Sequence, residues 1–419
     1  MRNQTRRSNL ETKFNPRSQG CERLVFLCSL LLILLSVNSP AVGPRLPNQD
    51  PEAIARGNAF AATADNPSAI YYNPAGISQL KGQNFDVGVY LVSAGVKFDA
   101  PNGQTAKADS AFQPVPQLYY VYSLKDTPIS FGLGVYAPYG LAVDWGNNTP
   151  FRTLAEKGKL LYVTVNPVIA WQILPSLSIG AGPTINYSKV EFKKGISPAP
   201  ATDEFKFNGD DTEAGFNAGL FWHPHPKWAA GVNYRYGTSM NYHGKSELTP
   251  YFPSTSTSAK LEFPQNVVVG LSFRPTEDWN FEVDVDWTEW KVLKQTVFEG
   301  TAVGPQTFPF NYRSSFMYEF GATRILPRDF FISAGYFYSE NSSPDKNFNP
   351  VVPDADLHLG SIGFGRRGKH WNWAAAYHFG YNPGREVKNN QPLPGTFENA
   401  NGTYHIFNQA VTLSATLKF

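Results

Sequence analysis

From Lys81 to the C-terminal Phe419, apolar and polar residues alternate with the period of two that half-buried β-strands show. Polar stretches that contain Pro or Gly interrupt the alternation and divide the region into separate segments. Fourteen segments result, at about 81–98, 113–124, 129–145, 159–173, 177–194, 212–222, 227–243, 258–273, 279–297, 309–325, 330–340, 354–365, 370–388 and 403–419. An even number of antiparallel strands can close into a barrel, so the pattern predicts an all-β fold.

The connections between these segments alternate between short and long. The short ones lie at 125–128, 174–176, 223–226, 274–278, 327–329 and 366–369, and longer polar stretches lie between them. Barrels of outer membranes have short turns at the periplasmic rim and long loops outside. The alternation therefore predicts a 14-stranded antiparallel transmembrane β-barrel over residues 81–419.

The two faces of the segments differ in chemistry. In 281–288, one face takes Phe281, Val283, Val285 and Trp287, and the other takes Glu282, Asp284 and Asp286. A soluble β-sandwich also predicts such alternation, because one face of each sheet is buried. Two features favour the barrel: Trp residues gather near segment ends, as at an interfacial girdle, and the last strand runs to the final residue.

Residues 1–41 have the features of a signal peptide. An apolar run of 14 residues, Leu24 to Val37, follows a basic region, and small residues and Pro40 come after it. Cleavage after Ala41 fits the small residues around that site. The alternative is an anchoring helix, for which the run is short. We expect export to the outer membrane of a Gram-negative-type cell.

Composition narrows the possible functions. Charged residues make up 17% of the chain and aromatic residues 15%, and the mean hydropathy of −0.31 argues against a helical membrane protein. The whole chain has a net charge of +2, and residues 1–41 alone carry +4. The remaining residues therefore have a net charge of −2, which predicts no nucleic-acid partner. Both cysteines, Cys21 and Cys28, lie in the leader, which excludes disulfides and cysteine-ligated zinc elsewhere.

A segment rich in small residues, 42–80, separates the leader from the strands. Asp50-Pro51 predicts the start of a short helix, with Asp50 as N-cap, and Asn66-Pro67 predicts its end. The segment closes on Asn73, Pro74, Ala75 and Gly76. We expect it to fill the barrel as a hatch, whereas an N-terminal helical cap on a soluble domain is the alternative.

The sequence GNAFAATADNPSAIYYNPAGISQL, from Gly57 to Leu80, resembles the N-terminal hatch of FadL-type outer membrane long-chain fatty acid transporters. Shorter similarities lie at 136–145, 263–270 and 353–356 and at the C-terminus. The resemblance implies a 14-stranded barrel plugged by the hatch, and it implies that the third strand is kinked to open a sideways passage. By this resemblance we assign the lateral opening to Pro138 and Gly140. The residue types fit, because Pro cannot donate a hydrogen bond to a β-ladder and Gly weakens one.

Other candidate chemistry has simpler explanations. Gly363 to Gly368 matches GxGxxG, but the expected strands on both sides predict a turn in place of a dinucleotide site. His223 and His225 lie in a short turn without further ligands nearby in sequence, so no metal site is predicted. Glu282, Asp284 and Asp286 are read as polar lumen lining, with Lys291, Arg324 or Arg385 as candidate partners. Nothing predicts an enzyme or a cofactor.

The resemblance implies passive uptake of long-chain fatty acids or similar hydrophobic molecules, through a lumenal apolar pocket and movement of the hatch. Three alternatives remain: an importer of aromatic hydrocarbons from the same family, a structural or general-diffusion porin without a hydrophobic ligand, and a secreted soluble β protein. We expect a monomer in contact with outer membrane lipid and lipopolysaccharide. The terminal Phe419 resembles the signal that the barrel-assembly machinery reads.

Overall fold

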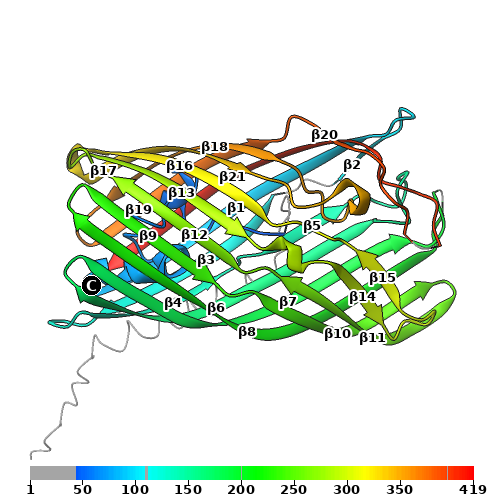
Figure 1. Ribbon diagram of the computed structural model, residues 1–419, viewed down its shortest axis with the longest axis horizontal. Helices are drawn as coiled ribbons and strands as arrows, with labels where there is room; N and C mark the ends of the chain where they lie inside the picture. The colour runs from blue at the N-terminus through cyan, green and yellow to red at the C-terminus, as the bar shows by residue number, and fades with distance from the viewer. Residues whose placement is uncertain (1–43, 109–111, 200, 394) are drawn as a thin grey trace, which may run out of the picture. The chain divides into compact units, whose positions relative to one another are not determined.

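The computed structural model describes residues 44–108, 112–199, 201–393 and 395–419. The predicted leader and its cleavage site lie outside these residues. The described part of the chain is a β-barrel that holds short helices inside it (Figure 1). Among the residues described, no helix is long and apolar enough to cross a membrane.

Fourteen antiparallel strands form the wall in the described residues, as predicted. Three of them are each interrupted once, so that two labelled strands make one wall strand. The wall strands are β1 (Gln83–Asp99), β3 (Gln113–Ser123), β4 with β5 (Ile129–Tyr136 and Gly140–Asp144), β6 (Lys157–Leu174), β7 (Leu177–Gly195), β8 (Glu204–His225), β9 with β10 (Trp228–Arg235 and Thr238–Thr249), β11 with β12 (Phe252–Phe263 and Asn266–Phe273), β13 (Trp279–Thr288), β16 (Ser315–Leu326), β17 (Phe330–Ser339), β18 (Leu357–Arg367), β19 (Trp371–Tyr381) and β21 (Gly402–Lys418).

Neighbouring wall strands pair in sequence order, and the last strand pairs with the first. β1 and β21 run antiparallel from the pair Asn84 and Lys418 to the pair Asp99 and Thr403, which closes the barrel. Four short strands lie in the loops: β2 (Thr105–Lys107), β14 (Gln295–Glu299), β15 (Gln306–Pro309) and β20 (Arg385–Val387). The 3₁₀ turns η2 (Trp290–Val292), η3 (Pro327–Asp329) and η4 (Asp345–Asn347) also connect strands.

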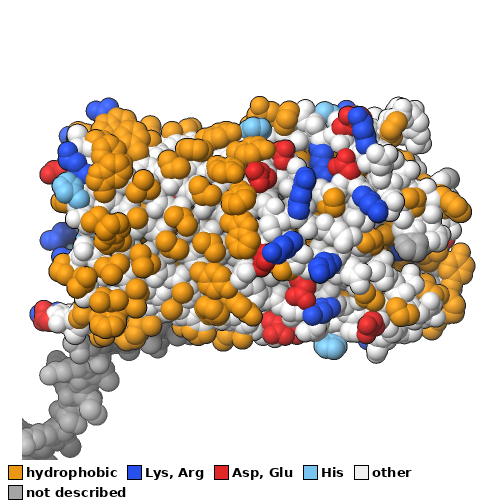
Figure 2. Space-filling view, in the orientation of Figure 1, with side chains coloured by type: hydrophobic (Ala, Val, Ile, Leu, Met, Phe, Trp, Pro, Cys, Tyr) orange, Lys and Arg blue, Asp and Glu red, His pale blue; other side chains and the backbone are white. Residues whose placement is uncertain are grey.

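The outer wall carries an apolar belt next to the rim with short turns. Apolar side chains cover this part of the surface, and ionised side chains begin beyond it (Figure 2). Val283 is 44% exposed and Leu271 53%, whereas Asp284 on the opposite face of β13 is fully buried. Such a surface is costly in water and stable against lipid tails.

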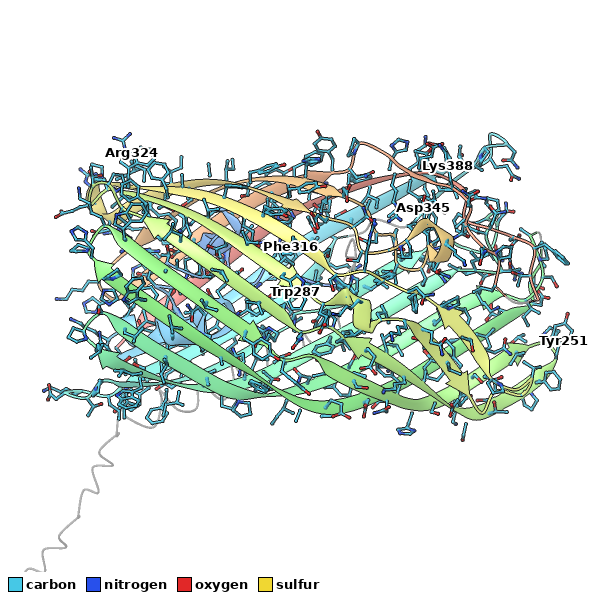
Figure 3. The ribbon with its side chains drawn as sticks, viewed as in Figure 1. Tyr251, Trp287, Phe316, Arg324, Asp345 and Lys388 are labelled. Carbon is cyan, nitrogen blue, oxygen red and sulfur yellow. The ribbon has the colours of Figure 1, made fainter. Side chains whose placement is uncertain are left out.

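Aromatic side chains mark the two edges of the belt. Trp279 and Trp287 lie at opposite ends of β13 on its outer face. Figure 3 places Trp287 and Phe316 between Arg324, near the short-turn end, and Tyr251, at the far end. Eight steps of about 3.3 Å at a tilt of about 40° span roughly 20 Å, close to the apolar height of a membrane barrel.

Candidate functional site

The N-terminal segment lies inside the barrel. α2 (Pro51–Ile54) begins at Asp50, whose carboxylate accepts hydrogen bonds from the Glu52 and Ala53 amides, as the N-cap prediction requires. α3 (Ala69–Tyr72) and η1 (Pro74–Gln79) follow. The residues of both α-helices are buried, so this segment plugs the barrel in the described structure.

Acidic side chains of β13 hold the hatch backbone. Asp284 accepts hydrogen bonds from the Phe60 and Ala61 amides, at 2.9 and 2.8 Å. Glu282 accepts from the Ala62 amide at 2.7 Å and pairs with Arg56 at 2.6 Å. These amides have no partner within a regular helix, so the two carboxylates satisfy buried donors that would otherwise destabilise the plug.

The predicted partners of these acids are wrong. Lys291 pairs with Glu289, Arg385 pairs with Asp345, and the Arg324 guanidinium lies over the Trp279 ring on the outer wall. The actual partners, Arg56 and Arg45, come from the hatch. The sequence could not show this, because more than 200 residues separate the members of each pair.

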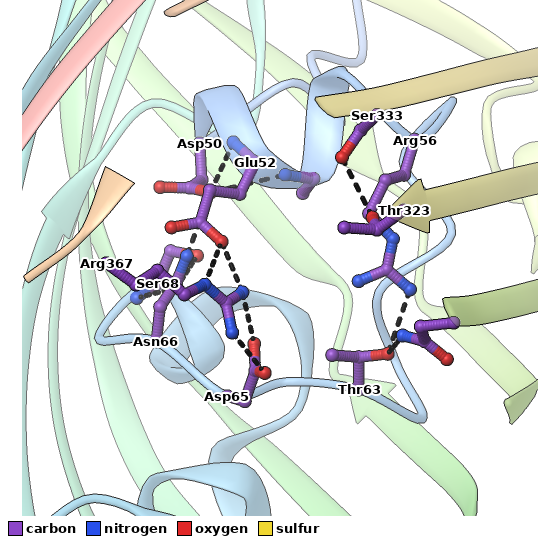
Figure 4. A network of polar contacts seen from close by, with 12 residues as sticks. Asp50, Glu52, Arg56, Thr63, Asp65, Asn66, Ser68, Thr323, Ser333 and Arg367 are labelled. Atoms are coloured by element: carbon purple, nitrogen blue, oxygen red, sulfur yellow. Dashed lines mark hydrogen bonds and ion pairs between the residues drawn. The ribbon is translucent and has the colours of Figure 1, made fainter. Parts of the chain in front are cut away.

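A second ionic cluster fastens the hatch to β18 (Figure 4). Arg367 extends inward from β18 and pairs with both Glu52 and Asp65, the latter at 2.7 Å. Asn66 also donates to Asp50 at 3.0 Å. The hatch is therefore held from two sides of the barrel by charge-assisted hydrogen bonds.

The predicted helix end at Asn66-Pro67 is wrong: α2 ends at Ile54, because Gly57 and Asn58 adopt left-handed conformations that turn the chain.

The motif from Asn73 to Gly76 lies at the start of η1. The Asn73 side chain accepts from the Ala75 amide and donates to the carbonyl oxygens of Ala61 and Leu220, at 2.8 and 3.0 Å. Pro74 occupies the first turn of η1. One side chain thus caps the turn and connects two parts of the hatch to β8. The role of this motif in uptake stays a prediction.

Sequence reasoning missed the glycines of the inner wall. A Cβ at Gly219 would overlap the Asn73 side chain, and a Cβ at Gly231 would overlap the Ala61 carbonyl oxygen. Glycine lets the hatch backbone approach the strands this closely. Glycine at inward-facing positions of consecutive predicted strands is the signal that could have located the plug's contact surface.

The third wall strand is interrupted where the sequence places Pro138 and Gly140. β4 pairs with β3 and β6, but β5 pairs only with β6 among the described residues. Residues 44–46, which we call the strap, lie against this interruption. Leu46 donates its amide to the Pro138 carbonyl, and the Gly140 amide donates to the Pro44 carbonyl, both at 2.8 Å. The role of Pro138 and Gly140 in a lateral opening stays a prediction.

The strap is also bound to the opposite wall. Arg45 donates to the two carboxylate oxygens of Asp286 on β13, one of them at 2.8 Å, and to the Thr288 hydroxyl at 2.6 Å. Asp286 is 2% exposed, so this bidentate pair is screened little by solvent. Arg45 therefore connects the interrupted strand to β13 across the lumen.

An apolar pocket lies beside the strap, toward the long loops. Its cavity is about 120 Å³, and Pro44 of the strap contributes to its wall. Its apolar wall includes Leu160, Phe192, Phe207, Phe263, Phe298 and Phe308. Phe298 packs edge-on against Phe207 and Phe308, with ring centroids 5.0 and 5.3 Å apart. Such walls bind apolar solutes by burial and aromatic contact.

The long loops form a fixed cover over this end of the barrel. Arg152 pairs with Asp203 at 3.0 Å and with Glu156 at 2.7 Å, which joins the loop before β6 to the loop before β8. Burial opposes the charge of the Asp203 carboxyl, but hydrogen bonds from Ser197 and Arg152 hold its pKa below the ordinary value. No group of three or more His, Cys, Asp or Glu side chains among the described residues could hold a metal ion.

A closed barrel with an apolar belt, an internal hatch and an apolar pocket defines a plugged channel of the outer membrane. The model of the family of outer membrane protein transport proteins (OMPP1/FadL/TodX) matches residues 32–417, and the chain belongs to this family. It is a family of transport channels for hydrophobic compounds and not of enzymes.

Individual proteins of similar sequence or fold support this assignment. An outer membrane protein of Neisseria meningitidis is 24% identical over 406 residues, which cover 82% of this chain and 84% of that protein. The structure of a Pseudomonas aeruginosa FadL homologue superimposes with a TM-score of 0.79 at 19% identity, covering 90% of this chain and all of the other. The P. putida toluene transporter TodX gives a TM-score of 0.72 at 16% identity, covering 89% and 99%.

Proposed function

We propose that this protein takes up small apolar molecules passively and releases them sideways into the membrane. The solute enters between the long loops, binds in the pocket, and leaves through the interruption between β3 and β5 when the strap moves away. The observation that carries the proposal is the position of the strap, because Pro44 contacts the pocket and both ends of the strap bond to the interrupted strand.

The size and walls of the pocket favour a compact aromatic hydrocarbon. A cavity of about 120 Å³ is slightly smaller than the engineered cavity of about 150 Å³ that binds benzene. The aromatic rings of the wall can contact both the edge and the face of a flat solute. Transfer of each buried methylene-sized group from water contributes about 0.8 kcal/mol, so a substituted benzene gains several kcal/mol on entry. A protein of similar fold is a toluene transporter.

Long-chain fatty acids are the second candidate. Lys159 borders the pocket, but it alternates along β6 with Gly158 and Leu160, which face the lumen, so its ammonium is not directed into the cavity. Glu191 pairs with Lys157 and Glu262 pairs with Lys260. A chain of sixteen or more carbons needs a longer cavity, which requires wall side chains such as Phe298 to turn aside.

A general-diffusion porin is disfavoured by the hatch. Arg56, Asn73 and the carboxylates of β13 occupy the lumen and are 0 to 2% exposed. Transport of an apolar solute through the pocket needs no energy source, because the solute moves down its concentration gradient into lipid.

We also propose the domain boundaries that accompany this function: a cleaved signal peptide over 1–41, the hatch over 42–80 and the barrel over 81–419.

Contacts outside the barrel belong to the same proposal. The apolar belt contacts membrane lipid, the charged surface beyond it contacts lipopolysaccharide, and Phe419, which is 76% exposed, engages the assembly machinery. The belt and the closed wall need no second subunit, so we propose a monomer.

Uptake by cells that lack the gene tests the proposal. Cells that carry the wild-type gene should accumulate labelled toluene several times faster than cells with an empty vector, and labelled oleate measured in parallel ranks the two candidates. If cells with and without the gene accumulate each compound at the same rate, and the purified protein conducts ions in bilayers, a general pore would replace this proposal.

A further inference from the structure

The outer ends of four loops border a second cavity, which is open to solvent and differs from the apolar pocket in its polar lining. It measures about 830 Å³ and lies between the β1–β2 connection, residues 148–150, Ala199 and residues 397–401. Its wall carries five side-chain amides, from Asn102, Gln104, Asn148, Asn399 and Asn401. We call these five residues, together with Phe397, the amide cleft.

The amide cleft is polar, and the described residues of the cavity wall include a single ionisable side chain, Glu398. The Glu398 carboxylate accepts hydrogen bonds from the Thr153 amide and hydroxyl, at 2.7 and 2.8 Å. Thr149, which is 2% exposed, also lines the cleft, and its hydroxyl has no partner among the described residues. This oxygen is shielded from solvent, so the exposed amides, and not the Thr149 hydroxyl, are the groups that a ligand in the cleft can reach.

Phe397 lies at the edge of the cleft and is 93% exposed. Its loop is fixed, because Glu398 binds Thr153, and the Ala400 amide donates to Asn390 at 2.8 Å. Its ring is therefore available to pack against a ligand that binds in the cleft.

Two of the five amide groups are oriented with their donors free, whereas the Asn102 amide donates to the Gln104 side chain. The side-chain oxygens of Asn399 and Asn401 accept backbone amides, at 3.1 and 2.8 Å. Each side chain is thereby fixed, and its NH₂ group has no partner in the described part of the chain. Asn148 is exposed on the facing loop. An amide offers both donors and an acceptor, and so matches a pair of neighbouring hydroxyl groups.

We propose that the amide cleft binds neutral pyranose sugars. The amides meet the ring hydroxyls, and Phe397 packs on the C–H face of the sugar ring. The described wall offers no cation to an anionic ligand, the Glu398 carboxylate is already hydrogen-bonded to Thr153, and an amide-lined wall does not suit an apolar solute. The site goes beyond the proposed uptake function and does not depend on it. Its sugar belongs either to lipopolysaccharide or to a glycan outside the cell.

Saturation-transfer NMR on the purified full-length protein in detergent tests the proposal. The probes are maltoheptaose, as an external glycan, and the core oligosaccharide released from lipopolysaccharide. We expect transfer to the ring protons of at least one probe, reduced at least fivefold by Phe397→Ala and by Asn148→Ala. Tyr251→Ala removes a 60% exposed aromatic from another loop and should leave the signal unchanged.

The comparison of the two probes identifies the source of the sugar, because the probe with the stronger saturation transfer resembles the natural ligand. The absence of transfer to both probes, or equal transfer to wild type and Phe397→Ala, would overturn the proposal. Loss of naphthalene uptake in Phe397→Ala without any sugar signal would likewise overturn it, in favour of an apolar entry site. Phe397 and Asn148 are exposed, so unchanged thermal midpoints are expected for both variants.

Discussion

Asp286→Asn should release the strap from β13. Arg45 is held by Asp286 through two charge-assisted bonds, and removal of the carboxylate charge leaves a mostly buried guanidinium with only the Thr288 hydroxyl and a neutral amide. Breaking such a pair costs about 3 kcal/mol. If this cost falls on the closed position of the strap alone, the population with the strap released rises by roughly two orders of magnitude.

Cysteine labelling measures this population. Leu46 lies in the strap and is 4% exposed, and the sequence has no cysteine beyond residue 28. We expect a maleimide to label Leu46→Cys about 100-fold faster in the Asp286→Asn background than in the Asp286 background. Asp99→Asn is the matched control, because Asp99 pairs with Lys97 at the surface and should not change the rate. Equal labelling rates in a folded Asp286→Asn barrel would refute the role of Arg45 as a latch.

Four further predictions address the hatch, the pocket and the loops. Gly231→Val should lower the thermal midpoint by several degrees, because its side chain would displace the Ala61 backbone; circular dichroism during heating measures this. Asn73→Ala should destabilise the hatch by about 1–3 kcal/mol, since two carbonyl oxygens lose a donor, and faster proteolysis within the hatch would show it. Phe298→Ala should enlarge the pocket and shift competition in uptake assays toward larger aromatic solutes, whereas an unchanged order would count against this pocket. The pKa of Asp203 is lowered in the folded protein, so its contacts stabilise the loops fully at pH values above the ordinary carboxyl pKa of about 4. This stabilisation is lost as the pH falls through the lower pKa of the folded state. Amide hydrogen exchange in 196–203 should therefore stay slow at pH 5 and become faster only in stronger acid.

The strands and their faces could be predicted from the sequence because the period of two is a local property. The alternation in 281–288 placed Val283 outside and Asp284 inside, and both positions agree with the observed exposure. Asp50 could also be predicted as an N-cap, because the cap depends on its own residue type and on the Pro that follows. Each of these features is decided within a few residues.

The contacts of the lumen could not be predicted from the sequence. Arg45 and Asp286 are 241 residues apart, and their contact depends on the whole barrel closing around the hatch. The strap looks like a linker in the sequence, because Pro44 and Arg45 carry no strand pattern of their own. Its role follows only from the β4–β5 interruption, which leaves backbone groups for it to bind.

A disulfide across the strap tests the central claim most directly. Arg45 and Tyr139 are antiparallel bridge partners, so their Cα atoms lie within disulfide range. In cells that carry Arg45→Cys with Tyr139→Cys, we predict that oxidation stops toluene uptake and that reductant restores it. The matched control, Leu220→Cys with Val232→Cys between β8 and β9, should transport equally in both states. Undiminished uptake by the oxidised strap variant would contradict release through the interrupted strand.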